Sequence, residues 1–126
     1  ASQLNPFSSY HLSMNTGFPN KYDRTHLYSG AALMIHGGCS SAGCYAMTDP
    51  NIEEIYAAVR DAIRGGQTSV QLQIYPFEMG FVNMFLHRKN TNYAFWQELK
   101  TGWDWFEHNK MPIPVDIKDK KYYIRS

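Results

Sequence analysis

A short apolar run, a small-residue loop and a strongly patterned helix follow one another in this chain and constrain its fold most. The run is Ala31–Ile35, and it lies between Gly30 and His36. Its length and the glycines around it favour a strand buried on both faces over a helix. The loop covers residues 37–43 and is rich in glycine and serine. The sequence therefore predicts a strand that leads through a loop into a helix.

The helix after the loop carries start and stop signals. Thr48 or Asp49 can cap it, and Pro50 suits its first turn because an N–H there would lack a partner anyway. Gly65 and Gly66 follow as stop signals. The apolar residues share one face at helical spacing: Ile52, Ile55, Tyr56, Val59 and Ile63. We expect a helix between these signals that buries this face.

The rest of the chain predicts two further extended segments, a second helix and a hairpin. Tyr10–Met14 fits a short extended piece between turns, and Ser69–Tyr75 alternates apolar and polar residues like a half-buried strand. A helix is expected over residues 92–109, and residues 115–124 are typical of a terminal hairpin. Residues 77–91 carry no clear pattern.

The second predicted helix has one apolar face and one exposed aromatic residue. The face is formed at helical spacing by Phe95, Leu99, Trp103 and Phe106, with Trp96 at its edge. Trp105 falls off this face, so we expect it to be exposed. Gly102 lowers the helix propensity locally.

Composition indicates a globular protein and excludes several functions. The chain has 126 residues, of which 44% are hydrophobic and 18% are charged, and this size fits one domain. Twelve basic and eleven acidic side chains give a net charge of +1, which offers no electrostatic case for binding nucleic acid or an anionic membrane. The longest apolar run, Ala31–Ile35, is far shorter than the roughly 18 residues expected of a membrane-spanning helix.

The loop after the predicted strand holds the residues that point to chemistry. His36 leaves the strand, and Cys44 stands just before the helix. A nearby imidazole can take the proton of a thiol, and a helix N-terminus stabilises negative charge. Glycines let backbone N–H groups approach a substrate oxyanion. We therefore expect Cys44 and His36 within direct or one-water reach, while a structural cysteine beside a core histidine is the plainer alternative.

Cys39 leaves two further alternatives open. It stands five residues before Cys44, so the pair could form a disulfide in an oxidising compartment, or Cys39 could simply fill the loop. His36 and the two cysteines could be three zinc ligands. Their spacing matches no usual structural-zinc pattern, and no fourth ligand is evident. We expect no metal site.

Five segments carry a family resemblance that extends over most of the chain. They are Asn5–Tyr10, Gly17–Arg24, Met34–Gly37, Ser41–Thr48 and Glu53–Tyr56. Together they resemble the YafK-like branch of the YkuD-type L,D-transpeptidase catalytic domains. The resemblance implies an α+β fold with a mixed, mostly-β core and two helices. It also implies one partial catalytic domain over residues 1–126, with an N-terminal piece before Ala1.

The resemblance assigns roles to residues of the loop and of neighbouring segments. Cys44 becomes the nucleophile and His36 its imidazole partner, while Ser41 and Gly43 contribute to the oxyanion region. The candidates for substrate binding are Arg24, Gly37, Tyr45, His11 and His26. Ala42 and Ala46 depart from the wider family, which has histidine and arginine there. Because these changes remove polar groups that could hold an acceptor, we expect hydrolysis to outweigh transfer.

The implied reaction is acyl transfer on peptidoglycan stem peptides. Cys44 would attack the carbonyl on the L-centre of meso-diaminopimelate and form a thioester, and neither metal nor organic cofactor is needed. Two alternatives stay open: an amidase of the same fold that cleaves peptidoglycan–lipoprotein links, and a non-catalytic cell-wall binding module. The resemblance implies the periplasm or cell envelope of a Gram-negative bacterium, while the charge balance and the short apolar runs predict no nucleic-acid partner and no transmembrane segment.

Overall fold

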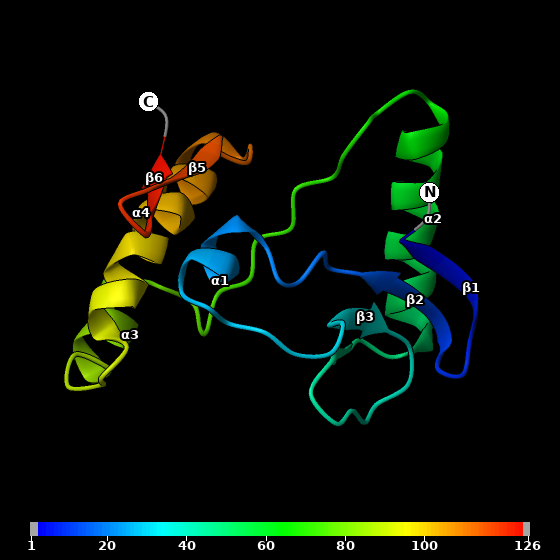
Figure 1. Ribbon diagram of the computed structural model, residues 1–126, viewed down its shortest axis with the longest axis horizontal. Helices are drawn as coiled ribbons and strands as arrows, with labels where there is room; N and C mark the ends of the chain where they lie inside the picture. Colours follow the sequence, from blue (N-terminus) through cyan, green and yellow to red (C-terminus); the bar gives the residue numbers. More distant parts are fainter. Residues whose placement is uncertain (1–2, 125–126) are drawn as a thin grey trace. The chain divides into compact units, whose positions relative to one another are not determined.

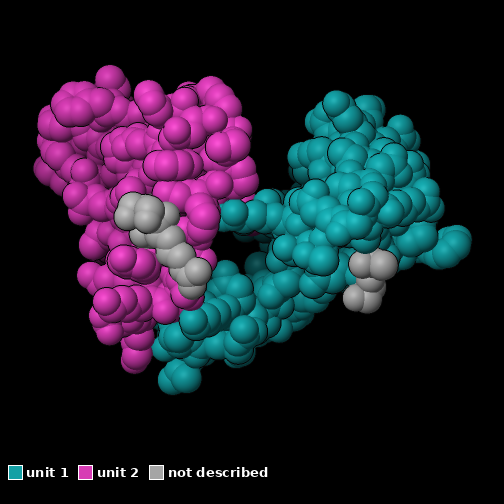
Figure 2. Space-filling model, turned by 90° about the horizontal axis from the view of Figure 1, so that it is seen from above, with its two compact units in different colours: residues 1–72 teal, residues 73–126 magenta. Residues whose placement is uncertain are grey.

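The chain divides into two compact units in the computed structural model, which describes residues 3–124. The first unit covers residues 1–72 and the second residues 73–126 (Figure 2). Each unit has its own buried residues and is described by itself below. The predicted domain over residues 1–126 stays a prediction.

A four-stranded sheet forms the frame of the first unit (Figure 1). Its strands are β1 (Leu4–Ser8), β2 (His11–Asn15), β3 (Met34–His36) and β4 (Tyr45–Ala46), and they lie in that order across the sheet. The β1–β2 and β2–β3 pairs are antiparallel, whereas β3 and β4 are parallel. The parallel pair matters for the site, because its crossover is the glycine-rich loop.

Helix α2 (Asp49–Arg64) packs against this sheet and closes the core of the unit (Figure 1). Met14 of β2 is buried together with Ile52 and Tyr56 of α2. The predicted helix is therefore confirmed, and Gly65 is its C-cap. Thr48 occupies the N-cap position, but its side chain makes no capping hydrogen bond.

A second, shorter helix precedes β3 in the first unit. Helix α1 (Lys21–Thr25) starts with a capping box, in which Asn20 and Asp23 each accept a hydrogen bond from the other's backbone N–H. The box satisfies two N–H groups that a helix start leaves without partners. One turn of helix is thereby held within a segment that carries no helical period.

The second unit consists of two helices and a hairpin. They are α3 (Phe81–Leu86), α4 (Tyr93–Asn109), β5 (Val115–Lys118) and β6 (Lys121–Ile124). The predicted second helix and terminal hairpin are both confirmed. Asp119 and Lys120 each have positive φ, as a two-residue hairpin turn of type I′ requires. No helix formed by residues 3–124 is long and apolar enough to cross a membrane.

Three expectations about strands are wrong. The strand expected over Ala31–Ile35 and buried on both faces is instead β3, which begins at Met34; Ala31 and Ala32 are exposed, and Met34 and Ile35 are half-buried. Ser69–Tyr75 forms no strand, and its apolar side chains Val70, Leu72 and Ile74 are between 43% and 45% exposed. An alternating segment becomes a strand only when a neighbour pairs with it, and none does so within the described residues. The mostly-β expectation also fails there, because the two long helices hold more residues than all the strands together. The mixed α+β class itself stands, but residues 3–124 form four helices where two were expected, because the short helices α1 and α3 lie in segments without a helical period.

The faces of α4 differ in part from the expectation. Trp105 is exposed as predicted, but Phe106 is exposed too, at 40%. Gly102 is the buried residue of the helix, and a Cβ atom there would lie 3.1 Å from the hydroxyl of Tyr75. Gly102 therefore permits a close approach in addition to weakening the helix.

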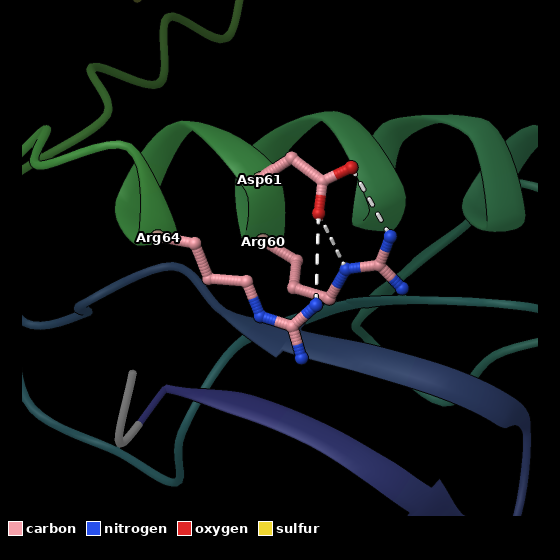
Figure 3. A network of polar contacts seen from close by, with 3 residues as sticks. All are labelled: Arg60, Asp61 and Arg64. Atoms are coloured by element: carbon pink, nitrogen blue, oxygen red, sulfur yellow. Dashed lines mark hydrogen bonds and ion pairs between the residues drawn. The ribbon is translucent and has the colours of Figure 1, made fainter.

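The last turns of α2 carry an exposed network of charges (Figure 3). Asp61 accepts hydrogen bonds from Nε and Nη2 of Arg60 at 2.7 and 3.1 Å, and Nη1 of Arg64 lies 3.9 Å from the same carboxylate. The hydrogen bonds from Arg60 lower the pKa of Asp61, and the charge of Arg64 acts in the same direction. The network lies at the opposite end of α2 from the loop.

Candidate active site

His36 ends β3 with its imidazole almost fully enclosed, at 4% exposure. Its Nδ1 lies 2.6 Å from the carbonyl oxygen of Gly37. A carbonyl oxygen only accepts, so Nδ1 carries the proton and Nε2 of the neutral ring is the acceptor. The backbone thereby selects the tautomer that a general base needs.

Three hydrogen bonds fix the base of the loop that follows His36. The N–H of Met47 donates to the carbonyl of His36 at 2.9 Å, and that of Thr48 donates to the carbonyl of Gly38 at 2.7 Å. The N–H of Gly38 donates to Oδ1 of Asp49 at 2.8 Å. The loop is therefore tied both to β4 and to the first residue of α2.

Gly37 is buried where the loop, the β1–β2 turn and α2 meet. A Cβ atom there would lie 2.6 Å from Oδ1 of Asp49 and 2.6 Å from the carbonyl oxygen of Tyr10. Real side chains do not reach such distances without a shift of the backbone. The glycine is thus required for close packing next to His36, and its own carbonyl orients the imidazole.

Cys44 stands immediately before β4 and is a free, half-buried thiol. In the parallel pair, Tyr45 lies opposite Ile35 and Ala46 opposite His36. Cys44 therefore enters the sheet on the strand next to the one that ends in His36. Contact between the two side chains stays a prediction.

The other loop residues are open to solvent. Cys39 is a free and exposed thiol, and Ser41 is exposed as well. Gly43 has a φ of +127°, a conformation that favours glycine, and it has open space where a Cβ would stand. Tyr45 is 40% exposed at the start of β4. These residues leave the side of the loop next to Cys44 uncovered.

His11 lies against the loop and is held by α2. Its Nε2 is 2.6 Å from Oε1 of Glu53, and its Cβ would be 3.2 Å from a Cβ on Gly37. His11 therefore borders the loop at Gly37. Its part in substrate binding stays a prediction.

Arg24 and His26 belong to a different part of the first unit. Nη1 of Arg24 donates to the carbonyl of Pro19 at 2.6 Å, and Nδ1 of His26 lies 3.1 Å from the carbonyl of Tyr22. The His26 ring stacks between the rings of Tyr22 and Tyr28. These contacts are within their own segment, so they give no support to a place beside His36.

Two residues near His36 were not assigned to the site from the sequence. The Tyr10 ring lies 4.5 Å from the His36 ring, centroid to centroid, and Asp49 holds Gly38. The sequence predicts Asp49 as a helix cap and Tyr10 as the start of a short extended segment. Among residues 3–124, no group of three or more histidine, cysteine or acidic side chains is arranged to hold a metal ion. The zinc alternative therefore has no geometric support in the described chain.

Comparison with known proteins identifies the family. No protein-family model matches the chain. It is 47% identical over 123 residues to "Putative L,D-transpeptidase YafK" of Escherichia coli K12, and equally to the protein of that name from strain O157:H7. The match covers 98% of this chain and 50% of each relative. The chain belongs to the YafK-like L,D-transpeptidase family and spans about half the length of these relatives.

Proposed function

We propose that this chain carries the nucleophile and base of a cysteine acyltransferase that acts on peptidoglycan stem peptides. The observation that carries the proposal is the state of His36, whose buried ring has Nδ1 tied to the Gly37 carbonyl and Nε2 left as acceptor. One further step of the β3–β4 register would set Cys44 opposite Met34. Met34 and His36 are two residues apart on one strand, so side chains at these levels leave the same face.

The proposed reaction proceeds through a thioester. Nε2 of His36 takes the proton of the Cys44 thiol as sulfur attacks the carbonyl carbon on the L-centre of meso-diaminopimelate. The imidazolium returns this proton to the leaving amine, and the C–N bond breaks. An acceptor amine or water then attacks the thioester and gives a proton to Nε2. The C–S bond breaks, and the thiolate recovers the proton.

The loop would stabilise the negative charge that develops on the substrate oxygen. In this proposal the backbone N–H of Cys44, with the segment from Ser41 to Gly43, contributes to the oxyanion region. Gly43 has a φ of +127°, so the backbone beside Cys44 adopts a conformation that side chains rarely allow, and no side chain at this position hinders the approach of a substrate. The α2 N-terminus, five residues after Cys44, adds a dipole of favourable sign. The exposure of Tyr45 suits contact with a peptide substrate, whereas Gly37 is buried and would act on the substrate only through the position it gives His36.

The name of the relatives supports an enzyme of this general kind. Peptidoglycan stem peptides are therefore the proposed substrate, and the cell envelope of a Gram-negative bacterium, on its periplasmic side, is the proposed location. No cofactor enters the proposed reaction, since the thioester conserves the energy of the broken amide.

A hydrolase of the same mechanism is the second candidate. Ala46 lies opposite His36 in the β3–β4 register and is exposed, and Ala42 is exposed on the loop. Neither side chain can hold a charged acceptor peptide, so water would compete for the thioester. An amidase that releases a lipoprotein from peptidoglycan fits this variant. A non-catalytic binding module is the remaining alternative, and it requires Cys44 to be unreactive.

The deciding experiment uses purified protein that contains residues 1–126 and defined tetrapeptide muropeptides, with and without excess D-amino acid. Mass spectrometry of the products separates exchanged or cross-linked peptides, which indicate transfer, from shortened ones, which indicate hydrolysis. Cys44→Ala should abolish both products, and Cys39→Ala is the matched control that should keep them. Full turnover by Cys44→Ala would refute the proposed nucleophile. No turnover by any variant would favour the binding module.

A further inference from the structure

We propose that Tyr10 is a positioning residue for His36, whose ring covers one face of the imidazole and favours its charged form. This inference rests on the proposed function, in which His36 becomes an imidazolium when it takes the proton of Cys44. Tyr10 would then support the step without touching the substrate.

The ring contact is close and one-sided. The Tyr10 and His36 ring centroids are 4.5 Å apart, with an angle of 33° between the ring planes. His36 is 4% exposed, whereas Tyr10 is 52% exposed. One part of the tyrosine therefore lies over the histidine while the rest meets solvent. The same ring extends toward Gly38, where a Cβ atom would be 3.8 Å from its Cδ1.

A tight turn between β1 and β2 holds Tyr10 in this place. The N–H of Leu12 donates to the carbonyl of Tyr10 at 3.0 Å, and His11 between them has a φ of 73°. A three-residue turn with positive φ at its centre is rare and strained, so surrounding contacts must maintain it. Ser8 Oγ accepts the N–H of Tyr10 at 3.2 Å, and Glu53 holds the His11 ring. Tyr10 is thus fixed from both sides of the turn.

The contact acts on the charged imidazole more than on the neutral one. The face of an aromatic ring carries partial negative charge, which attracts a cation placed over it. Nδ1 of His36 already donates to the Gly37 carbonyl oxygen, and the Tyr10 ring packs against the imidazole. The two contacts together restrict rotation of the His36 side chain. The ring thereby keeps Nε2 directed and stabilises the imidazolium that forms after proton transfer.

Other titratable groups next to the His36–Gly38 segment come from several elements. Asp49 and Glu53 of α2 hold Gly38 and His11 respectively, and Cys44 precedes β4. Both carboxylates would also favour a positive charge on His36. They are left unchanged in the test below, so a difference between Tyr10 variants reports the aromatic ring.

The test compares Tyr10→Leu, which removes the ring, with Tyr10→Phe, which keeps it, in a Cys39→Ala background. NMR follows the His36 ring signals against pH, and iodoacetamide measures the reactivity of Cys44. For Tyr10→Leu we expect the midpoint of the His36 signals to fall by about 0.5 pH unit and alkylation at neutral pH to slow about threefold. Tyr10→Phe should give the same His36 midpoint and the same alkylation rate as the Cys39→Ala protein that retains Tyr10. Tyr123→Leu, at a similarly exposed tyrosine of the second unit, should leave both readouts unchanged.

The outcomes separate this inference from the proposed function. A folded Tyr10→Leu protein with an unmoved His36 midpoint would overturn the role of Tyr10, and so would a Tyr10→Phe protein that behaves like Tyr10→Leu. If Tyr10→Leu does not fold, Tyr10→Trp should raise the midpoint, because tryptophan attracts cations most strongly; a lowered or unchanged midpoint would then overturn it. An unreactive Cys44 in every variant, with a midpoint that still follows the ring, would refute the proposed nucleophile and retain the Tyr10–His36 coupling.

Discussion

The backbone N–H of Met47 donates to the carbonyl oxygen of His36 at 2.9 Å, one residue beyond the last paired residue of β4. This bond secures the parallel pairing of β3 and β4 at His36, the last residue of β3. The loop between the two strands therefore leaves and re-enters the sheet at neighbouring strands, with His36 at its start and Cys44 at its end.

Gly37→Ala should destabilise the protein by about 1–3 kcal/mol, the usual cost of forcing an extra methyl group into a packed site. The added Cβ would lie 2.6 Å from both Asp49 Oδ1 and the Tyr10 carbonyl oxygen. Urea unfolding measures the effect. Gly80→Ala is the control, since its Cβ would meet nothing within 4 Å and its φ of −66° suits alanine. Equal unfolding midpoints for the two variants would contradict the packing described for Gly37.

Acylation by a carbapenem should depend on Cys44 and His36. A β-lactam carbonyl is a strained analogue of the donor amide, so one adduct is expected on the protein and none on Cys44→Ala. His36→Gln should slow adduct formation by about 10²- to 10⁴-fold, as expected for loss of a general base. Intact-mass spectra over time measure both. His108→Gln, at an exposed histidine of α4, should react normally. An adduct on Cys44→Ala would place the reaction elsewhere.

Local signals were enough to predict the two long helices, α2 and α4, but not the short helices α1 and α3 or the sheet. Pro50 and Gly65 bracket α2, and the bounds of α4 agree to within one residue of the expectation. Ser69–Tyr75 shows the opposite case, because its alternation states which side chains could be buried and says nothing about a partner strand. β1 was also missed, since Pro6 and an irregular register between Asn5 and Ser8 obscure the strand pattern.

The site residues also include some that the local sequence predicts and others whose place depends on the pairing of distant strands. His36, Gly37 and Cys44 stand within nine residues, so the sequence alone predicts that they belong to one loop and its ends. Tyr10 reaches His36 only because β2 pairs with β3, and a contact across 26 positions has no local signature. Asp49 was visible as a cap, but its acceptance of the Gly38 N–H depends on where the loop returns.

Arg60→Gln should raise the pKa of Asp61 toward its ordinary value of 3.8, and more so than Arg64→Gln. Arg60 donates the hydrogen bonds that lower this pKa most, whereas Arg64 acts by charge alone from 3.9 Å. A lowered pKa in the folded state contributes stability above the ordinary value, and that contribution disappears as the pH falls through the lowered one. NMR titration of the Asp61 carboxyl group measures the change, and an equal effect of both variants would contradict this ranking.

Tyr75→Phe should flatten the loss of stability at alkaline pH. Partial burial against α4, where its ring meets the edge of Trp103, raises the pKa of Tyr75 above 10.0 because the charged phenolate is poorly solvated there. Because the pKa of Tyr75 is higher in the folded state, the neutral phenol contributes fully to the free energy of unfolding below its ordinary pKa. This contribution is lost as the pH rises through the raised pKa. Below pH 9 the variant should be less stable by about 1 kcal/mol, since it lacks the hydrogen bond that Tyr75 donates to Gln73 at 3.0 Å. Urea unfolding of both proteins from neutral pH to about pH 11 measures the difference, which should shrink as Tyr75 ionises. Parallel stability curves for the two proteins would contradict the raised pKa of Tyr75.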